Sequence, residues 1–248
     1  MTILNGFAII SKIPLLPSSI LIRRQIRTDH QIREIFEATN LAKAMEMLLD
    51  NPETEISVSL VLKLHSILMQ NIRDDAAGRF RTNKEWVRVG NHIGANPQFV
   101  HGFMSDLVEK YNTSDDQYFL DKIVYFHAEF ENIHPFIDGN GRTGRLLLNL
   151  ELMKNGYPIT VIRNEDRDEY YTALETAKVK SNYELLAAFI EKSVENTFWM
   201  YYKYFDEDTK MKFEEYLKKN GINPKEVYQK RFEDYPETER DFPRDWYK

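Results

Sequence analysis

The chain has 248 residues, of which 42% are apolar and 13% aromatic, and its formal net charge is -6 at pH 7. This composition is typical of a globular protein with a well-buried core and excludes a wholly disordered chain. The acidic balance argues against a protein that binds nucleic acid through overall positive charge, although a local basic groove stays open. The sequence has no cysteine, which excludes disulfides and thiolate chemistry and fits a reducing compartment such as the cytoplasm.

The first 22 residues are apolar, but they lack a basic start and contain Lys12, Pro14 and Pro17. We therefore interpret residues 1–30 as an N-terminal arm and not as a targeting segment. No apolar run approaches the ~20 residues that a membrane-spanning helix needs. The expectation is a soluble, cytoplasmic protein whose partners are neither nucleic acid nor a membrane.

Apolar residues at helical spacing predict helices along most of the chain. The predicted helices cover residues 32–49, a segment opened by Ser57 as N-cap, and residues 99–111, 117–131, 145–153, 170–177, 186–198 and 208–220. A short helix is predicted from Asn223-Pro224 to residue 232, and Trp246 is a candidate anchor in the charged tail that follows. His65 lies beside the apolar face of the second helix, and we interpret it as a core or boundary histidine.

The helical pattern breaks between residues 77 and 98. Trp86-Val87-Arg88-Val89-Gly90 predicts one or two short strands, the only β content expected. We therefore predict an all-α fold in a single domain overall. It would comprise the arm of residues 1–30, a core of residues 31–200, and a C-terminal helical extension and tail of residues 201–248.

The chemistry is concentrated in one stretch between two predicted helices, His134-Pro-Phe-Ile-Asp-Gly-Asn-Gly-Arg-Thr-Gly-Arg145. Unpaired N–H groups and the helix dipole make a helix N-terminus a site for anions, and Gly139, Asn140 and Gly141 supply such groups. Arg142 and Arg145 are three residues apart on the first turn, so we expect them to share one face and to reach adjacent phosphates.

Two further residues of this stretch extend the phosphate site. Asp138 would repel phosphate unless a cation bridges them, and Mg²⁺ prefers such oxygen ligands. His134 can accept a proton near neutral pH, which makes it a candidate general base. An isolated histidine would more simply be structural, but a neighbouring carboxylate and anion site favour catalysis. Phe136 is interpreted as a core anchor that fixes the loop.

The sequence context argues against other nucleotide-binding, zinc-binding and serine-nucleophile motifs. Gly139-x-Gly141-x-x-Gly144 matches a dinucleotide fingerprint, but that fingerprint follows a strand and this one follows a predicted helix. A P-loop would need Lys-Ser/Thr where Arg145-Leu146 stands. No histidine spacing indicates zinc, and no nucleophile elbow is present.

Residues 134–145 resemble the complete signature of the Fic family, HPFx(D/E)GNGRxxR, with no substitution. The resemblance extends from about residue 34 to residue 196 and includes Gly78-Arg79-Phe80-Arg81. It implies a Fic-type helical bundle with a small β-hairpin flap, over residues 31–200. It also implies a protein adenylyltransferase, which transfers AMP from ATP to a Ser, Thr or Tyr hydroxyl of a target protein.

The resemblance also implies a role for each residue of the signature. His134 would deprotonate the target hydroxyl, and Asp138 would hold Mg²⁺ against the α- and β-phosphates. The loop from Gly139 to Gly141 would form the anion hole, with Asn140 touching phosphate. Arg142 and Arg145 would orient the β- and γ-phosphates.

The segment of Trp86, Val87, Arg88, Val89 and Gly90 falls where the family has its flap, which presents the target segment by strand pairing. An ordinary hairpin packed on the helices is a second interpretation of Trp86, Val87 and Val89, and it is compatible with the first.

Many family members carry an inhibitory Ser/Thr-x-x-x-Glu-Gly/Asn motif, whose glutamate pairs with the second arginine of the signature. Neither Glu131-Asn132 nor Glu195-Asn196 has the required Ser or Thr, and Ser18-Ser19 is followed by Ile22-Arg23 in place of Glu-Gly. A relaxed internal segment, a separate antitoxin-like inhibitory protein, or no restraint of this kind all stay open.

The leading hypothesis is therefore a Mg²⁺- and ATP-dependent adenylyltransferase. The signature alone does not separate this activity from UMP or phosphocholine transfer or from AMP removal. An inactive Fic-fold interaction module is the alternative from another class, and the intact catalytic positions argue against it.

Overall fold

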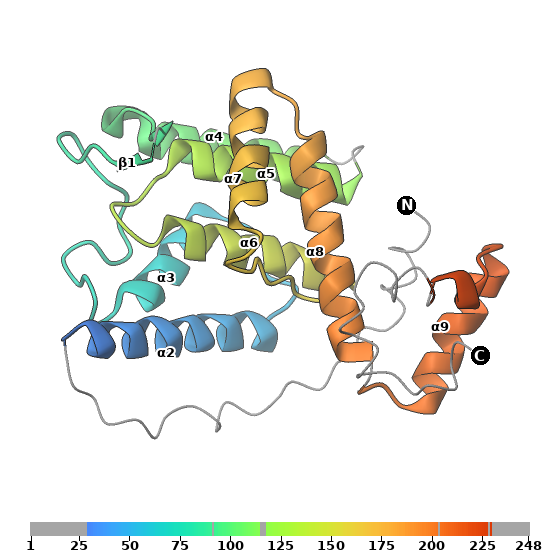
Figure 1. The fold of residues 1–248 in the computed structure, drawn as a ribbon. Helices are drawn as coiled ribbons and strands as arrows, with labels where there is room; N and C mark the ends of the chain where they lie inside the picture. The colour runs from blue at the N-terminus through green and yellow to red at the C-terminus, as the bar shows by residue number, and fades with distance from the viewer. Residues whose placement is uncertain (1–28, 91, 115–117, 203, 228, 230–248) are drawn as a thin grey trace.

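The computed structural model describes residues 29–90, 92–114, 118–202, 204–227 and 229 (Figure 1). Helices dominate this part of the chain, which confirms the predicted all-α class. The helices are α2 (Asp29–Asp50), α3 (Val58–Met69), α4 (Val100–Thr113), α5 (Phe119–Ile133), α6 (Asn140–Lys154), α7 (Arg167–Lys180), α8 (Glu184–Tyr202) and α9 (Glu207–Lys219). A single 3₁₀ turn, Pro97–Phe99, precedes α4 among the described residues.

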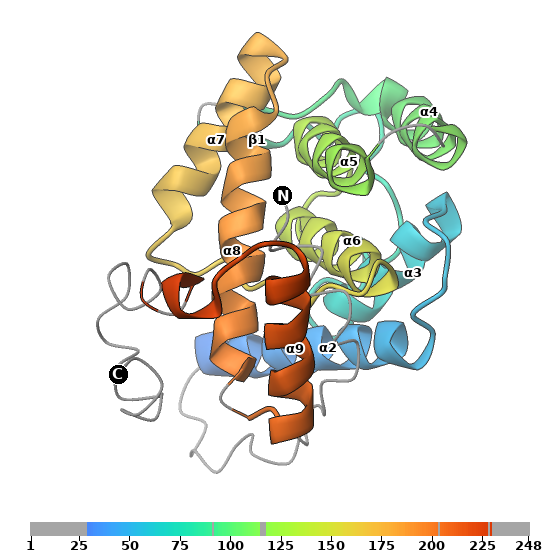
Figure 2. The same ribbon diagram turned by 90° about the vertical axis from the view of Figure 1, so that its right-hand side faces the viewer.

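Helix α6 lies at the centre of the bundle, in contact with α2, α3 and α5 (Figure 2). It is apolar on nearly every side, because Leu146, Leu147, Leu148, Leu150 and Leu152 are all buried. A helix that is hydrophobic all round must be covered on all sides, so the other helices form a shell around it. The first turn of α6 is thereby fixed from several directions.

Helix α3 begins as its sequence predicts. The Ser57 side chain accepts a hydrogen bond from the backbone N–H of Leu60 at 3.1 Å, so Ser57 is the N-cap. At the other end, the buried Asn40 of α2 donates to the carbonyls of Leu68 (3.2 Å) and Gln70 (2.7 Å). Two carbonyls that the helix leaves unpaired are satisfied this way, and α2 is fixed beside α3.

The sheet consists of β1 (Arg88–Val89) paired antiparallel with β2 (His92–Ile93), with Arg88 opposite Ile93. The prediction of short strands in this region is confirmed, although Trp86, Val87 and Gly90 lie outside the paired residues. The side chains of Trp86 and Val89 are 58% and 43% exposed, so the second interpretation, a hairpin packed on the helices, is wrong for them.

Helices α7 and α8 pack against each other and against α5. At the end of α8, Phe198 meets Phe213 of α9 with ring centroids 5.0 Å apart, which fixes α9 against the core. No helix in the described ranges has the length and apolar character needed to cross a membrane.

Three predictions fall wholly or partly on residues outside the described ranges. The N-terminal arm of residues 1–30, with Ser18-Ser19, lies outside them except for its last two residues. The tail that contains Trp246 also lies outside. Of the short helix predicted after Asn223, residues 224–227 are helical and residues 230–232 lie outside.

Candidate active site

The predicted loop connects α5 to α6 and begins in an unusual backbone conformation. His134 caps α5 with φ 51°, in the left-handed region, and its N–H donates to the carbonyl of Phe130 at 2.9 Å. Non-glycine residues rarely adopt this conformation, although histidine does so more often than most. The chain reverses sharply at the candidate base, and a left-handed residue at a candidate site is consistent with strain held for function.

Phe136 anchors the loop, as its sequence position predicts. Its side chain is fully buried and stacks on the ring of His65, with centroids 3.6 Å apart and planes 5° from parallel. Phe80 lies 5.3 Å away on another side. The loop is therefore packed into the core at its second residue after His134.

The buried side chain of Asn140 ties the loop to itself. Its Oδ1 accepts from the N–H of Phe136 and its Nδ2 donates to the carbonyl of Phe136, both at 2.8 Å. Both polar atoms of the side-chain amide are therefore engaged within the loop. The predicted contact of Asn140 with phosphate is therefore left to its backbone N–H.

His65 has a larger role than the core position predicted for it. Its Nδ1 accepts from the N–H of Gly78 at 3.1 Å, so Nε2 carries the proton and donates to the carbonyl of Asp138 at 3.0 Å. Burial lowers the pKa of His65 to about 4, and both hydrogen bonds are satisfied in the neutral form. The core histidine thus holds the acidic residue of the loop in place.

Gly139 is the N-cap of α6, with φ 79°. A methyl group at this position would lie 2.9 Å from the sulfur of Met69 and 3.3 Å from the ring of His65. Both the backbone conformation and the close approach require glycine. The N–H groups of the first turn of α6 follow this residue.

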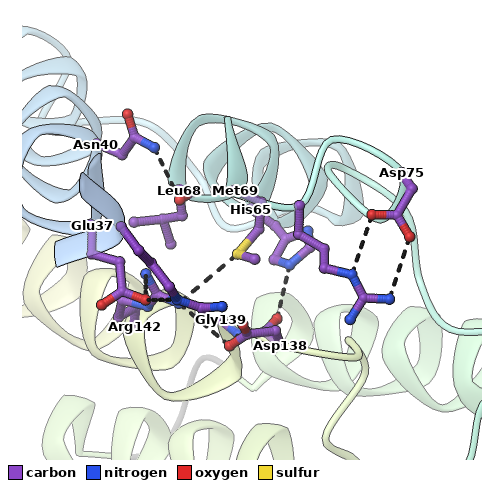
Figure 3. Close-up of polar contacts among 11 residues, drawn as sticks. Glu37, Asn40, His65, Leu68, Met69, Asp75, Asp138, Gly139 and Arg142 are labelled. Carbon is purple, nitrogen blue, oxygen red and sulfur yellow. Dashed lines mark hydrogen bonds and ion pairs between the residues drawn. The ribbon is translucent and has the colours of Figure 1, made fainter. Parts of the chain in front are cut away.

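A ring of alternating charges lies over the first turn of α6 (Figure 3). Arg33 of α2 pairs with Asp138 (2.7 Å) and with Glu37 (3.0 Å), and Arg142 lies 3.5 Å from Glu37 and 3.4 Å from Asp138. Hydrogen bonds from Arg33 and from the N–H of Gly139 outweigh burial and lower the pKa of Asp138, so its carboxylate is ionised. The buried Nη1 of Arg142 has no hydrogen-bond partner.

Arg145 lies on the other side of the same turn. A methyl group at Gly141 would meet its Nη1 at 3.0 Å, and its charge acts on the buried Glu131 and on Tyr170 of α7. The two arginines occupy neighbouring positions of α6, three residues apart, but their guanidinium groups have different partners. Arg142 turns toward the carboxylates of α2 and the loop, whereas Arg145 turns toward α5 and α7.

His134 lies in a largely buried setting beside the flap. Burial is the main cause that lowers its pKa to about 4, so the imidazole is neutral at pH 7. Its ring meets the ring of His92 from β2 edge to face, with centroids 6.0 Å apart. His92 in turn contacts Lys178 of α7. A neutral imidazole can accept a proton, as a general base must.

Arg81 supports His134, and sequence reasoning did not single it out. It is 1% exposed and donates from Nε to the carbonyl of His134 (2.7 Å) and from Nη2 to that of Ile133 (3.0 Å). It also donates to the carbonyls of Glu85 and Ala95 on the two sides of the flap. One buried guanidinium thus joins the flap to the end of α5. Only its place within Gly78-Arg79-Phe80-Arg81 hinted at such a role.

Asp138 is the only carboxylate of the signature stretch, and no group of three or more His, Asp or Glu side chains that could hold a metal occurs in the described part of the chain. Mg²⁺ commonly uses one or two protein carboxylates and completes its coordination with substrate phosphates and water. A single ionised carboxylate beside an anion site fits that pattern.

The geometry can be compared with known proteins. Residues 55–152 match the Fic/DOC family. The chain contains a Fic domain. It is 34% identical over 154 residues to the protein adenylyltransferase fic-1 of Caenorhabditis elegans, a match that covers 60% of this chain and 30% of that protein. It is also 34% identical over 151 residues to the protein adenylyltransferase Fic of Drosophila erecta, covering 58% of this chain and 30% of the relative.

Solved structures agree with the fold of this Fic domain. A Fic-1 fragment from C. elegans superposes with a TM-score of 0.62 and 26% identity, covering 81% of this chain and 62% of that one. A Fic family protein from Desulfovibrio desulfuricans G20 superposes with a TM-score of 0.59 at 22% identity, covering 93% of this chain and 76% of that one. The chain spans about 30% of the length of the curated relatives it matches.

Proposed function

We propose that this chain is a protein adenylyltransferase, a nucleotidyltransferase that moves AMP from ATP to a Ser, Thr or Tyr hydroxyl of another protein. The observation that carries the proposal is a neutral histidine, His134, placed at the edge of a helix N-terminus that also bears an ionised carboxylate and two arginines. The relatives named as protein adenylyltransferases support the same reaction.

In this reaction the target hydroxyl oxygen forms a bond to the α-phosphorus of ATP. The bond between that phosphorus and the oxygen leading to the β-phosphate breaks, and pyrophosphate leaves. His134 takes the proton of the hydroxyl, which its neutral imidazole is able to do. The rigid loop behind it, anchored by Phe136 and clamped by Asn140, holds the base in position.

The phosphates would bind at the first turn of α6. The backbone N–H groups of Asn140 and Gly141 have no helical partners there, and the helix dipole favours negative charge. The N–H of Gly139 donates to Oδ1 of Asp138 at 2.6 Å and would have to exchange that partner for phosphate. Nη1 of Arg142, which has an ion-pair contact with Glu37 at 3.5 Å but no hydrogen bond, is a buried donor suited to a phosphate oxygen. Arg145 would bind from the opposite side, so the two arginines would enclose the polyphosphate.

Asp138 would hold Mg²⁺ through its ionised carboxylate. When bound, the cation would offset the negative charge of the nucleotide phosphates. The carboxylate must first exchange its present partners, Arg33 and Arg142.

The protein substrate would dock at the flap, residues 86–93. Two short strands with exposed Trp86 and Val89 can pair with an extended segment of a target. A groove of about 410 Å³ opens behind β2, between α4 and α5, and includes Ile93, Phe103 and Tyr125 in its lining. Such a groove is suited to an apolar side chain of the same target.

The decisive experiment incubates the protein with Mg²⁺, cell lysate and ATP labelled at the α-phosphate. We expect labelled protein bands, and His134→Ala should reduce their formation by roughly 10²- to 10⁴-fold. His101→Ala, at an exposed histidine of α4, is the matched control and should label like the wild type. Equal labelling by wild type and His134→Ala would refute the mechanism. Labelled UTP and CDP-choline in parallel reactions identify the donor.

We also propose that restraint of the enzyme comes from a separate inhibitory protein, which would place a glutamate on Arg145. The purified chain should then label itself or its target without an activating step. If the purified chain becomes active only after part of its own sequence is removed, this part of the proposal is wrong and an internal segment inhibits.

A further inference from the structure

The buried carboxyl group of Glu131 lies next to the proposed base and has no role in the chemistry described above. Its side chain is 12% exposed, and its Oε1 has no hydrogen-bond partner. Its Oε2 is 3.8 Å from Nδ1 of His134. Carboxylates are rarely buried without a partner, so a group of this kind calls for a function.

The surroundings of Glu131 make room for the carboxyl group. A methyl group at Gly144 would lie 2.7 Å from Oε1, so glycine at this position of α6 keeps the space open. The charged and titratable groups that face Glu131 come from every neighbouring element. The groups that act on its carboxyl are His134, Arg145 of α6 and Tyr170 of α7. His127 of α5 also lies against Gly144, and His92 of β2 faces the backbone of Glu131.

Three of these neighbours are themselves connected. Tyr170 is hydrogen-bonded to Nε2 of His127 at 2.7 Å, and Nδ1 of His127 faces the carbonyl of Gly144 at 3.3 Å. Because that carbonyl only accepts, Nδ1 of His127 carries the proton and Tyr170 donates to Nε2. His127 is therefore neutral, and Arg145 is the positive group on this side of the carboxyl.

The geometry also fixes the tautomer of His134. Its Nδ1 lies 3.4 Å from the carbonyl oxygen of Glu131 and 3.8 Å from the carboxyl Oε2 of the same residue. Both oxygens attract an N–H, so we assign the proton to Nδ1. Nε2 then has the free lone pair that a general base needs.

We propose that Glu131 is a positioning residue, whose carboxylate lies beside the imidazole of His134 in the field of the positive charge of Arg145 and stabilises the imidazolium that forms when His134 takes the substrate proton. The inference rests on the proposed function, because it concerns the same base. A distance of 3.8 Å is too long for a strong hydrogen bond but falls within ion-pair range. The carboxylate would therefore act mainly after the proton has moved to His134.

Glu131 and His134 titrate in different pH ranges, so the proposed role of Glu131 predicts a particular pH dependence of kcat. Burial raises the pKa of Glu131 to about 7, although Arg145 opposes this, and burial lowers the pKa of His134 to about 4. Near pH 6 both groups are neutral. As the pH rises through about 7, Glu131 ionises while His134 stays neutral, so kcat should rise over this range.

The test measures kcat and KM for ATP in the wild type and in Glu131→Gln from pH 6 to pH 8.5. Glutamine keeps the shape but never ionises, so we expect the rise near pH 7 to vanish and kcat at pH 8 to fall about 10- to 100-fold, with KM little changed. Glu131→Asp should keep the rise and part of the rate. Asp121→Asn is the control on the same helix, because Asp121 is exposed in the first turn of α5, at the end opposite His134.

A uniform loss of kcat at every pH in Glu131→Gln, with the rise retained, would overturn the inference in favour of a purely structural role. A rise in KM with unchanged kcat would overturn it too, because Glu131 would then serve only Arg145.

A second measurement is independent of AMP transfer. The Cε1–H NMR signal of His134, assigned through His134→Ala, should shift as the pH passes about 7 in the wild type and stay level there in Glu131→Gln. If this shift is seen but no transfer occurs, the proposed function fails and the pairing of the two residues stands. If transfer occurs and the His134 signal titrates alike in the wild type and in Glu131→Gln, the inference fails and the proposed function stands.

Discussion

The two sides of the first turn of α6 differ in how far their charged and titratable side chains are exposed to solvent. On the outer side, Asp138 and Arg142 meet Arg33 and Glu37 of α2 in a ring of alternating charges, whose side chains are 17–49% exposed. On the inner side, the side chains of His134 and Glu131 are largely buried. Packing holds them in place, and Oε1 of Glu131 has no hydrogen-bond partner.

This difference indicates a division of labour. Exposed ion pairs contribute little to stability and exchange partners easily, which suits a surface that must accept a charged ligand. Buried groups keep one geometry and have shifted pKa values, which suits proton transfer. The following variants test whether the two sides differ in this way.

The largest effect is expected at Arg81, which supports the inner side. Arg81→Met removes the donors for the carbonyls of Ile133 and His134, and we expect the free energy of unfolding to fall by about 4 kcal/mol, measured by urea denaturation. Arg79→Met is the control, because Arg79 pairs with Glu85 at the surface and should cost less than about 1 kcal/mol. Equal losses in the two variants would contradict the contrast between the two sides.

Acid should destabilise the inner side next most strongly. Burial lowers the pKa values of His65, His127 and His134 to about 4, below the ordinary value of 6.5. Between pH 6.5 and pH 4 the unfolded chain therefore binds more protons, so stability is complete above pH 6.5 and falls as the pH drops. We expect the free energy of unfolding to fall by several kcal/mol between pH 6.5 and pH 4.5, measured by urea denaturation.

Glu131 should change the free energy of unfolding in the opposite direction as the pH varies. Its raised pKa of about 7 means that the folded state holds the proton more strongly, so its contribution is lost as the pH rises through 7. Maximum stability is expected near pH 6.5, because the loss from Glu131 falls between its ordinary pKa of 4.5 and about 7. Glu131→Gln should therefore steepen the rise in stability from pH 4.5 to pH 6.5 and remove the small fall just above it. A wild-type curve that rises continuously from pH 6.5 to pH 8 would contradict this assignment.

Asn140 lies where the two sides meet and allows a matched comparison. Asn140→Ala leaves the N–H and carbonyl of Phe136 unpaired, and Asn149→Ala does the same to Thr160 further along α6. Each variant should lose about 2 kcal/mol of unfolding free energy. Only Asn140→Ala should also reduce AMP transfer, because only its loop carries His134. Equal transfer by the two variants would show that the loop does not position the base.

The sequence predicts the elements of this fold better than it predicts the neighbours of the site. Helical periodicity locates α3, α5 and α6 because each buries one face or all of its surface, and the spacing of the signature places its residues on one loop. The side chains that complete the loop come from elsewhere. Arg33 is 105 positions from Asp138, and no local pattern relates them.

Residue type and helical spacing also say little about the environment of single side chains. The buried state of Arg81 and the exposure of Trp86 reverse what their residue types favour, because the flap has to be joined to α5 and left open to solvent. The directions of the Arg142 and Arg145 side chains could not be predicted either. Helical spacing gives only the positions of their Cα atoms, whereas carboxylates from α2 and α5 decide where each guanidinium lies.

The smallest effect on stability, and the most informative for the outer side, is expected from Arg33→Ala. The exposed pair with Asp138 should be worth less than about 1 kcal/mol of unfolding free energy. Removing this competing cation leaves the carboxylate available to Mg²⁺, so the affinity for Mg²⁺ with a non-hydrolysable ATP analogue should rise about 3- to 10-fold at low salt and less at high salt, measured by calorimetry. Arg73→Ala, which breaks an exposed pair with Asp75, should leave the affinity unchanged. A lower affinity in Arg33→Ala would mean that Arg33 binds the nucleotide itself, and the outer ring would then be part of the binding site and not a set of exchangeable partners.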